Sequence, residues 1–154
     1  MHNHHGEYKS AVSEQLVLFS ARGPWNDETM RHGVVKFSKH IEAVSSNADN
    51  PSKQWAQLSV LYGESLMPPS TFDIFIKQTS IRKTRGLALL AVVIKDSDVA
   101  MTIRQQLRFC YDAANIEYAF FDDIDAALNA ISHAELRFDE QEVRQFLSQN
   151  DFSS

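Results

Sequence analysis

A single cysteine, Cys110, occurs among the 154 residues, so no disulfide can form within the chain. A chain without disulfides is typical of a reducing compartment, and the opening MHNHHGEYK has neither the basic region nor the apolar stretch of a secretion signal. The longest strongly apolar run, Leu87 to Ile94, is far too short to cross a bilayer as a helix. We therefore expect a cytoplasmic protein without a transmembrane segment.

Positive charge is scarce, because 15 lysines and arginines face 20 aspartates and glutamates and leave a net charge of -5. A general nucleic-acid binder needs positive potential to replace phosphate counterions, so that class is excluded. Only 5 glycines and 4 prolines occur, and 44% of the residues are hydrophobic, which argues against low complexity. The length suits one domain with a core of its own, and we expect only residues 1–6 to form a flexible terminus.

The common motifs of enzymes are missing as well. Neither G-x-G-x-x-G nor G-x-x-x-x-G-K-[ST] occurs, so no glycine-rich loop offers its amides to phosphates. There is no G-x-S-x-G nucleophile elbow, and no C-x-x-C or H-E-x-x-H metal spacing. The sequence therefore predicts a protein that is not an enzyme and that has neither a cofactor nor a metal.

Five groups of chemically interesting residues have structural explanations that we favour. His2, His4 and His5 could chelate a metal, but a frayed terminus is the explanation that we favour. His32 and His40 fit a solvated helix surface, and Cys110 fits the apolar stripe of a helix as an inert thiol. Asp122, Asp123 and Asp125 form an acidic cluster that helix capping explains. The basic string from Lys77 to Arg85 suits a solvated helix end, with an anion or phosphate patch as the alternative.

Hydrophobic periodicity divides the chain into alternating strands and helices. We predict strands at 7–12, 15–23, 55–62, 87–95 and 116–121. The first predicted helix runs from Asn26 or Asp27 to about Val44, and the second runs from Thr71 to near Gly86. A third helix should follow a cap at Asp96, and a fourth should follow a cap at Asp122 or Asp123. The last predicted helix covers residues 139–149.

This order predicts an α/β fold with a mostly parallel central sheet of about five strands. The first strand, joined to the second by a tight turn, should be an antiparallel edge strand. Helices should pack on the sheet, and an extra C-terminal helix should follow. We place the domain at residues 7–132 and the appended helix and tail at residues 133–154.

Residues 7 to 132 resemble the STAS superfamily, the fold of bacterial anti-sigma factor antagonists. The resemblance is greatest to its divergent SpoIIAA-like branch of small STAS-like proteins, which is related to a lipid-binding type. The resemblance rests on the element order and on the run IEYAFFDDIDAALNAI, in which the last strand continues into a helix. The residues that match the family layout there are Phe121, Asp122, Asp125, Ala127 and Leu128.

The family carries its regulatory serine after a central strand, at the first turn of the next helix. The corresponding stretch here runs from Pro69 to Phe72, without the preceding Asp and following Gly of the family motif. The resemblance makes Ser70 and Thr71 candidate phosphoacceptors, since a phosphate there would meet the free amides of the helix. A simpler role is that one of the two hydroxyls caps the helix.

Two functions follow as hypotheses. The first is a regulatory module that binds a partner protein through the corner between strand and helix, where Leu66 and Met67 should be exposed as an apolar patch. The predicted contact residues of this corner are Leu66, Met67, Pro68, Pro69, Ser70 and Thr71. The second is a carrier or sensor of a small apolar ligand or lipid, held among the ten phenylalanines and two tryptophans between helices and sheet. The C-terminal helix has an apolar edge that would pack on its own domain or support a homodimer.

Overall fold

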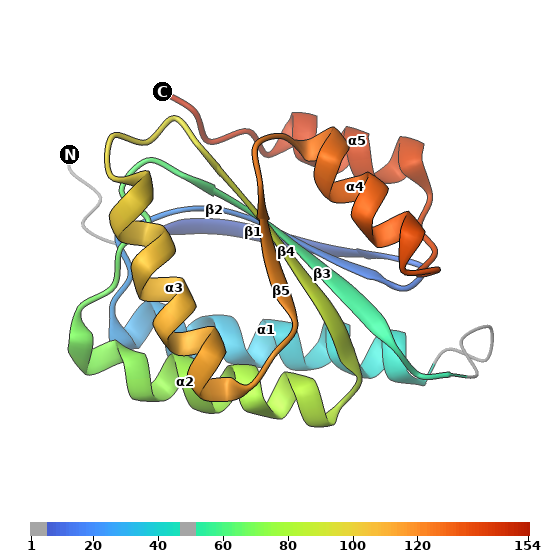
Figure 1. Ribbon diagram of the computed structural model, residues 1–154, viewed down its shortest axis with the longest axis horizontal. Coiled ribbons are helices and arrows are strands. Elements are labelled where there is room, and N and C mark those ends of the chain that lie inside the picture. Colours follow the sequence, from blue (N-terminus) through green and yellow to red (C-terminus); the bar gives the residue numbers. More distant parts are fainter. Residues whose placement is uncertain (1–5, 47–51) are drawn as a thin grey trace.

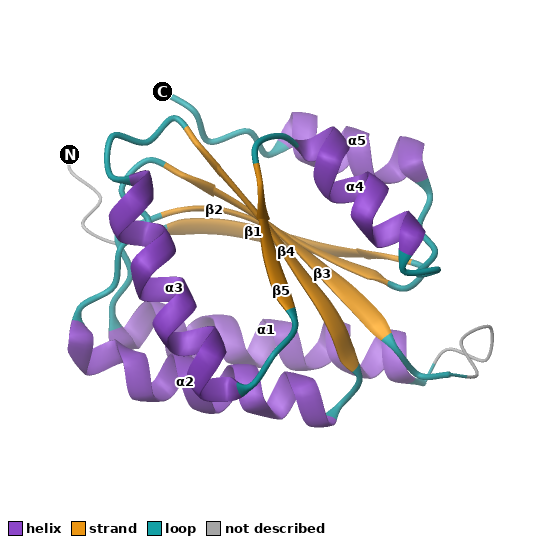
Figure 2. Cartoon of the chain, in the orientation of Figure 1, coloured by secondary structure: helices purple, strands orange, loops and turns teal. Residues whose placement is uncertain are grey.

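The computed structural model describes residues 6–46 and 52–154. Ten elements follow one another along the chain (Figures 1 and 2): β1 (Glu7–Ser13), β2 (Leu16–Arg22), α1 (Asp27–Ser45), β3 (Trp55–Tyr62), α2 (Pro69–Thr84), β4 (Leu87–Lys95), α3 (Ala100–Ala114), β5 (Tyr118–Phe121), α4 (Ile124–His133) and α5 (Glu140–Gln149). The α/β fold and the alternation of strands with helices are as the sequence predicts. No helix in the described part of the chain is long and apolar enough to cross a membrane.

The five strands form one sheet in the order β1-β2-β3-β4-β5. β1 pairs antiparallel with β2, and the other neighbours pair parallel, which confirms the predicted antiparallel edge. Every residue of β3 is buried, because the strand lies in the middle of the sheet and both faces are covered.

Helices cover the two faces of the sheet unequally. α1, α2 and α3 lie on one face, and α4 and α5 lie on the other (Figure 1). Three successive right-handed crossovers that advance the sheet in one direction place their helices on the same side, which explains the three-helix layer. α5 is held across the second face because its Val143 and Leu147 are buried there.

Side-chain caps define several helix starts. Asn26 accepts a hydrogen bond from the backbone N–H of Thr29 at 2.8 Å, and Asp123 accepts one from that of Ala126 at 2.8 Å. At each of these two helices, one of the two predicted candidates is therefore the cap. The predicted cap at Asp96 is wrong. Asp96 has a positive φ of 50°, and α3 begins only after Val99, which has no side-chain cap.

Candidate functional site

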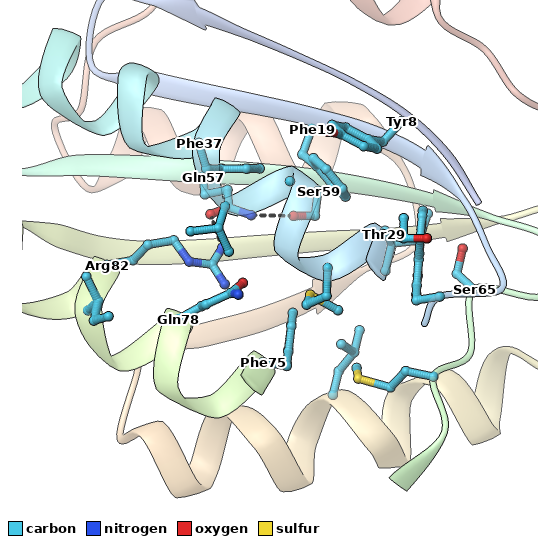
Figure 3. Close-up of a pocket in the computed structure, with 18 of the residues that line it drawn as sticks. Tyr8, Phe19, Thr29, Phe37, Gln57, Ser59, Ser65, Phe75, Gln78 and Arg82 are labelled. Carbon is cyan, nitrogen blue, oxygen red and sulfur yellow. Dashed lines mark hydrogen bonds between the residues drawn. The ribbon is translucent and has the colours of Figure 1, made fainter. Parts of the chain in front are cut away.

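A cavity of about 140 Å³ lies between α1, α2 and the sheet (Figure 3). α3 contributes Leu107 and Tyr111 to its lining, and β1 contributes Tyr8. Most of the wall is apolar, with rings and sulfur from several elements: Phe19, Trp25, Met30, Phe37, Met67 and Phe75. These side chains are bulky and differ in shape, and a space remains between them.

One side of the cavity is polar, and it comes from the middle of the sheet. Gln57 and Ser59 are two residues apart on β3, so both side chains point to the face that α1 and α2 cover. Both residues are buried, and the Gln57 amide donates a hydrogen bond to the Ser59 hydroxyl at 2.9 Å (Figure 3). Apolar residues such as Val60 and Leu58 occupy the opposite face of the same strand. Two polar groups thus interrupt an otherwise apolar layer at the cavity.

Arg82 supplies the only charge among the lining residues that the structure describes. Its side chain extends from α2 to the polar wall, where it donates to Gln57 Oε1 at 2.6 Å and to Thr79 Oγ1 at 2.8 Å. Only 8% of Arg82 is exposed. The prediction of a solvated basic string is therefore wrong at this position, because Arg82 lies on the inner face of α2, whereas Lys83 and Arg85 are exposed.

Burial sets the electrostatics of the cavity. It lowers the pKa of the Arg82 guanidinium, since the charged form is removed from water. Burial also raises the pKa of the Tyr111 phenol, so Tyr111 is neutral at physiological pH. Two rings flank the cation, with the Phe37 centroid at 5.5 Å and the Phe75 centroid at 5.9 Å from Cζ.

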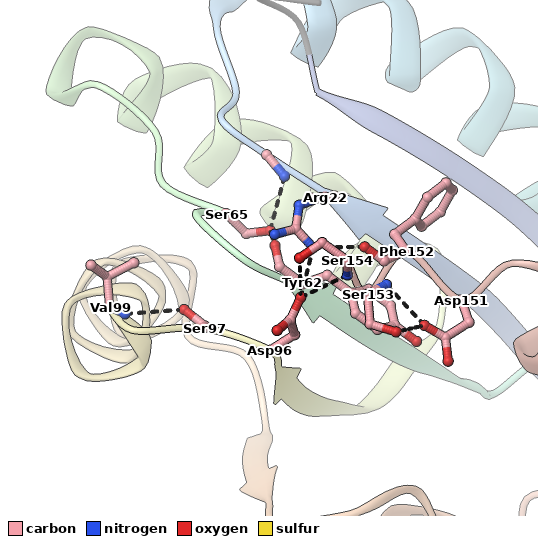
Figure 4. A network of polar contacts seen from close by, with 11 residues as sticks. Arg22, Tyr62, Ser65, Asp96, Ser97, Val99, Asp151, Phe152, Ser153 and Ser154 are labelled. Atoms are coloured by element: carbon pink, nitrogen blue, oxygen red, sulfur yellow. Dashed lines mark hydrogen bonds and ion pairs between the residues drawn. The ribbon is translucent and has the colours of Figure 1, made fainter.

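The carboxyl edge of the sheet, where parallel α/β sheets commonly bind ligands, is covered by the C-terminal segment (Figure 4). Arg22 at the end of β2 donates to Asp96 at 3.1 Å and to the Phe152 carbonyl at 2.6 Å. The backbone N–H of Ser154 donates to the same Asp96 carboxylate at 2.9 Å, and the Phe152 ring lies edge-on to Tyr62. These contacts fill the edge, so the cavity beneath α1 and α2 is the better candidate site.

The corner from Leu66 to Thr71 is only partly at the surface. Pro68, Pro69 and Ser70 are exposed, and Leu66 is partly buried. Met67 is 4% exposed and lines the cavity, and its backbone exchanges two hydrogen bonds with the Gln106 side chain. The expectation of an exposed Met67 is wrong, because α3 packs over this residue.

The two hydroxyls of the corner have different surroundings. Thr71 is fully buried, and its hydroxyl donates to Asp27 Oδ1 at 2.8 Å, which joins the starts of α1 and α2. Ser70 is exposed in the first turn of α2. The prediction that one of these hydroxyls caps the helix is wrong, because α2 begins at Pro69 and its N-cap is Pro68, which makes no side-chain capping bond.

The remaining sequence candidates do not form a site. Cys110 is a buried free thiol, as predicted. His32 hydrogen-bonds Tyr8, and His40 hydrogen-bonds Ser10 on β1. His2, His4 and His5 lie outside the described residues. Within the described ranges no cluster of three or more potential metal-ligating side chains occurs.

Sequence analysis missed the polar wall made of Gln57, Ser59 and Arg82. The stretch WAQLSVLY carries the signal, because its Gln and Ser fall on one face of a strand whose other positions are apolar. Arg82 carries no comparable signal, since a basic residue near a helix C-terminus is usually solvated.

Comparisons with protein-family models, curated proteins and solved structures found no match. The geometry of the cavity therefore carries the functional argument.

Proposed function

We propose that this protein is a non-enzymatic module that binds a small apolar ligand in the cavity between α1, α2 and the sheet, as a carrier or sensor. The observation that supports this most directly is an aromatic-lined space of about 140 Å³ between the helices and the sheet. A cavity of roughly 150 Å³ is large enough to bind a benzene ring. The resemblance to the branch of the STAS superfamily that is related to a lipid-binding type favours the same class of ligand and stays a prediction.

Gly33 provides a way to close the cavity without disturbing its wall. It lies in the middle of α1, lines the cavity, and has nothing within 4 Å of the position where a Cβ would stand. The Gly33→Leu variant therefore places a side chain into open space. Gly33→Ala is the matched control, since it adds one methyl group and removes the helix penalty of glycine, worth about 0.5–1 kcal/mol.

The test is calorimetric titration with 3-phenylpropan-1-ol, a neutral probe with one aromatic ring. We expect the original chain and Gly33→Ala to bind it and Gly33→Leu to lose most of the binding heat, because the leucine occupies the cavity. Thermal unfolding should show that both variants are folded. If the original chain gives no binding heat, or if Gly33→Leu binds as well as Gly33→Ala, the proposal is wrong.

A second candidate function, binding of a partner protein, is favoured by an apolar patch beside the corner. Phe109 on α3 is 59% exposed and contacts Phe72 of α2, with a centroid distance of 5.7 Å and ring planes tilted by 41°. Pro68 and Pro69 are exposed at the start of the same α2 helix. An exposed aromatic ring beside exposed prolines is typical of a surface that contacts another protein.

This candidate is tested by affinity capture with Phe109→Asp, because changing the buried Met67 would disrupt the fold. The control is Arg108→Asp, an exposed position one residue away. We expect a specific partner to be recovered by the original chain and the control, and to be lost with Phe109→Asp. Equal recovery by all three proteins would remove this role for the patch.

A further inference from the structure

Arg82 is a buried cation without a buried anion to match it. Charged side chains are rarely this buried unless they are paired. No carboxylate of the described residues forms an ion pair with Arg82, although Arg22, Arg104 and Arg144 all have such partners. The neutral oxygens of Gln57 and Thr79 are its hydrogen-bond acceptors. A negative charge supplied by another molecule would therefore match the buried charge of Arg82.

The guanidinium has donors to offer such a charge. It carries five N–H groups, and the bonds to Gln57 and Thr79 use two of them. Figure 3 shows the guanidinium beside Gln57 at the polar wall of the cavity, and the rings of Phe37 and Phe75 lie near it on the apolar side. Gln78 lies four residues before Arg82, thus on the same side of α2, and lines the cavity too.

Nothing in the lining offsets the positive charge. Aspartate, glutamate and histidine are missing from the described lining residues. Tyr111 also lines the cavity, and its phenol is neutral because burial raises its pKa. At a given distance the attraction of Arg82 for an anion is several times larger in this apolar surrounding than in water.

We propose that Arg82 binds the carboxylate of a small ligand whose ring-sized apolar body fills the cavity. The inference rests on the proposed function and specifies its ligand class. A planar guanidinium matches the two oxygens of a carboxylate, and a single cation balances a single negative charge. The apolar wall of the cavity matches the apolar body of such an acid, and the single charge of Arg82 matches its carboxylate.

The experiment compares three probes that share one ring and one three-carbon arm: 3-phenylpropanoate, 3-phenylpropan-1-ol and 3-phenylpropan-1-amine. Calorimetry on the intact chain at neutral pH should show the carboxylate binding at least about tenfold more tightly than the alcohol, because hydrogen bonds to charged groups are worth that or more. The amine, which is a cation, should bind more weakly than the alcohol because Arg82 repels it.

The Arg82→Met variant tests the residue itself. It keeps an unbranched side chain of similar length, and we expect it to remove the preference for the carboxylate over the alcohol. Arg85→Met is the matched control, since it removes an exposed positive charge three residues away. It should leave the ratio of carboxylate to alcohol affinity unchanged.

The outcomes separate the two proposals. Equal affinity for the carboxylate and the alcohol, or an Arg82→Met ratio equal to that of the original chain, overturns the role of Arg82 and leaves an apolar ligand site. Loss of binding to all three probes overturns both proposals. If Arg82→Met fails to fold, Arg82→Gln decides, because it removes the charge and keeps hydrogen-bonding groups: the preference for the carboxylate should be lost, and a preserved preference contradicts the role of Arg82.

Discussion

The thiol of Cys110 illustrates how burial controls chemistry at the scale of one residue. The side chain is fully buried on α3, among the apolar residues that face the sheet. Burial raises its pKa to about 11, with a smaller contribution from the negative charge of Asp73. The nucleophilic form of a cysteine is the thiolate, so this residue is inert at physiological pH.

We expect iodoacetamide to leave Cys110 unmodified in the folded protein at pH 8. A thiol with a pKa of about 11 is ionised in about one molecule in a thousand at that pH, and the sulfur is also covered. Raising the pH increases the thiolate fraction, whereas guanidinium chloride should expose the group fully. Mass spectrometry of the intact chain measures the modification. Rapid labelling of the folded protein at pH 8 would show that the environment of Cys110 is different.

Arg82 is a contrasting case, because its guanidinium stays charged although burial lowers its pKa and makes the charge costly. Its neighbours in the basic string are solvated, while Arg82 itself lies against Gln57, a residue 25 positions away in the sequence. A buried guanidinium held by neutral acceptors weakens the fold relative to an apolar side chain of the same size. Such a residue is typical of a site where binding outweighs stability.

At the scale of elements, α5 covers the second face of the sheet. Its first residues are tied to the hairpin between β1 and β2, since the N–H of Asp139 donates to the Ser13 hydroxyl at 2.9 Å. Leu147 is 5% exposed and packs in the same cluster as Leu16 and Leu58. The apolar edge of α5 thus packs on its own domain, which is one of the two roles that the sequence predicts for it.

Leu147→Ala should therefore lower the free energy of unfolding by about 2–5 kcal/mol, the usual cost of removing a buried leucine side chain. Ser148→Ala, at an exposed position of the same helix, should change it by less than about 0.5 kcal/mol. Urea denaturation followed by circular dichroism measures both values. A loss for Leu147→Ala no larger than that of the control would mean that α5 does not stabilise the sheet.

At the scale of the whole molecule, the order of the strands creates the cavity. Because β2, β3, β4 and β5 follow one another across the sheet, α1, α2 and α3 form one layer on a single face. Bulky aromatic side chains lie between the sheet and the helices α1 and α2, and a space remains next to Gln57 and Ser59. The C-terminal segment closes the carboxyl edge of the same sheet, so the ligand site that we propose lies under the helices.

Local patterns in the sequence were sufficient for the elements and for the α/β class. The continuous apolar run of β4 marks a strand covered on both faces, and the bounds of β3 and β4 agree with the prediction. Asn26 and Asp123 mark helix starts because capping depends on residues three positions apart. These features depend on short-range chemistry, which a single sequence contains in full.

Only the tertiary structure decided the strand order, the burial of Met67 and Arg82, and the place of Asp96. Periodicity shows which side of a helix is apolar, but it does not show which distant element covers that side. Met67 is covered by α3, Arg82 faces β3, and Asp96 bonds to Arg22 and the C-terminal segment. The desolvation that gives Arg82 its proposed role arises from residues far away in the chain, and it exists only once they are packed together.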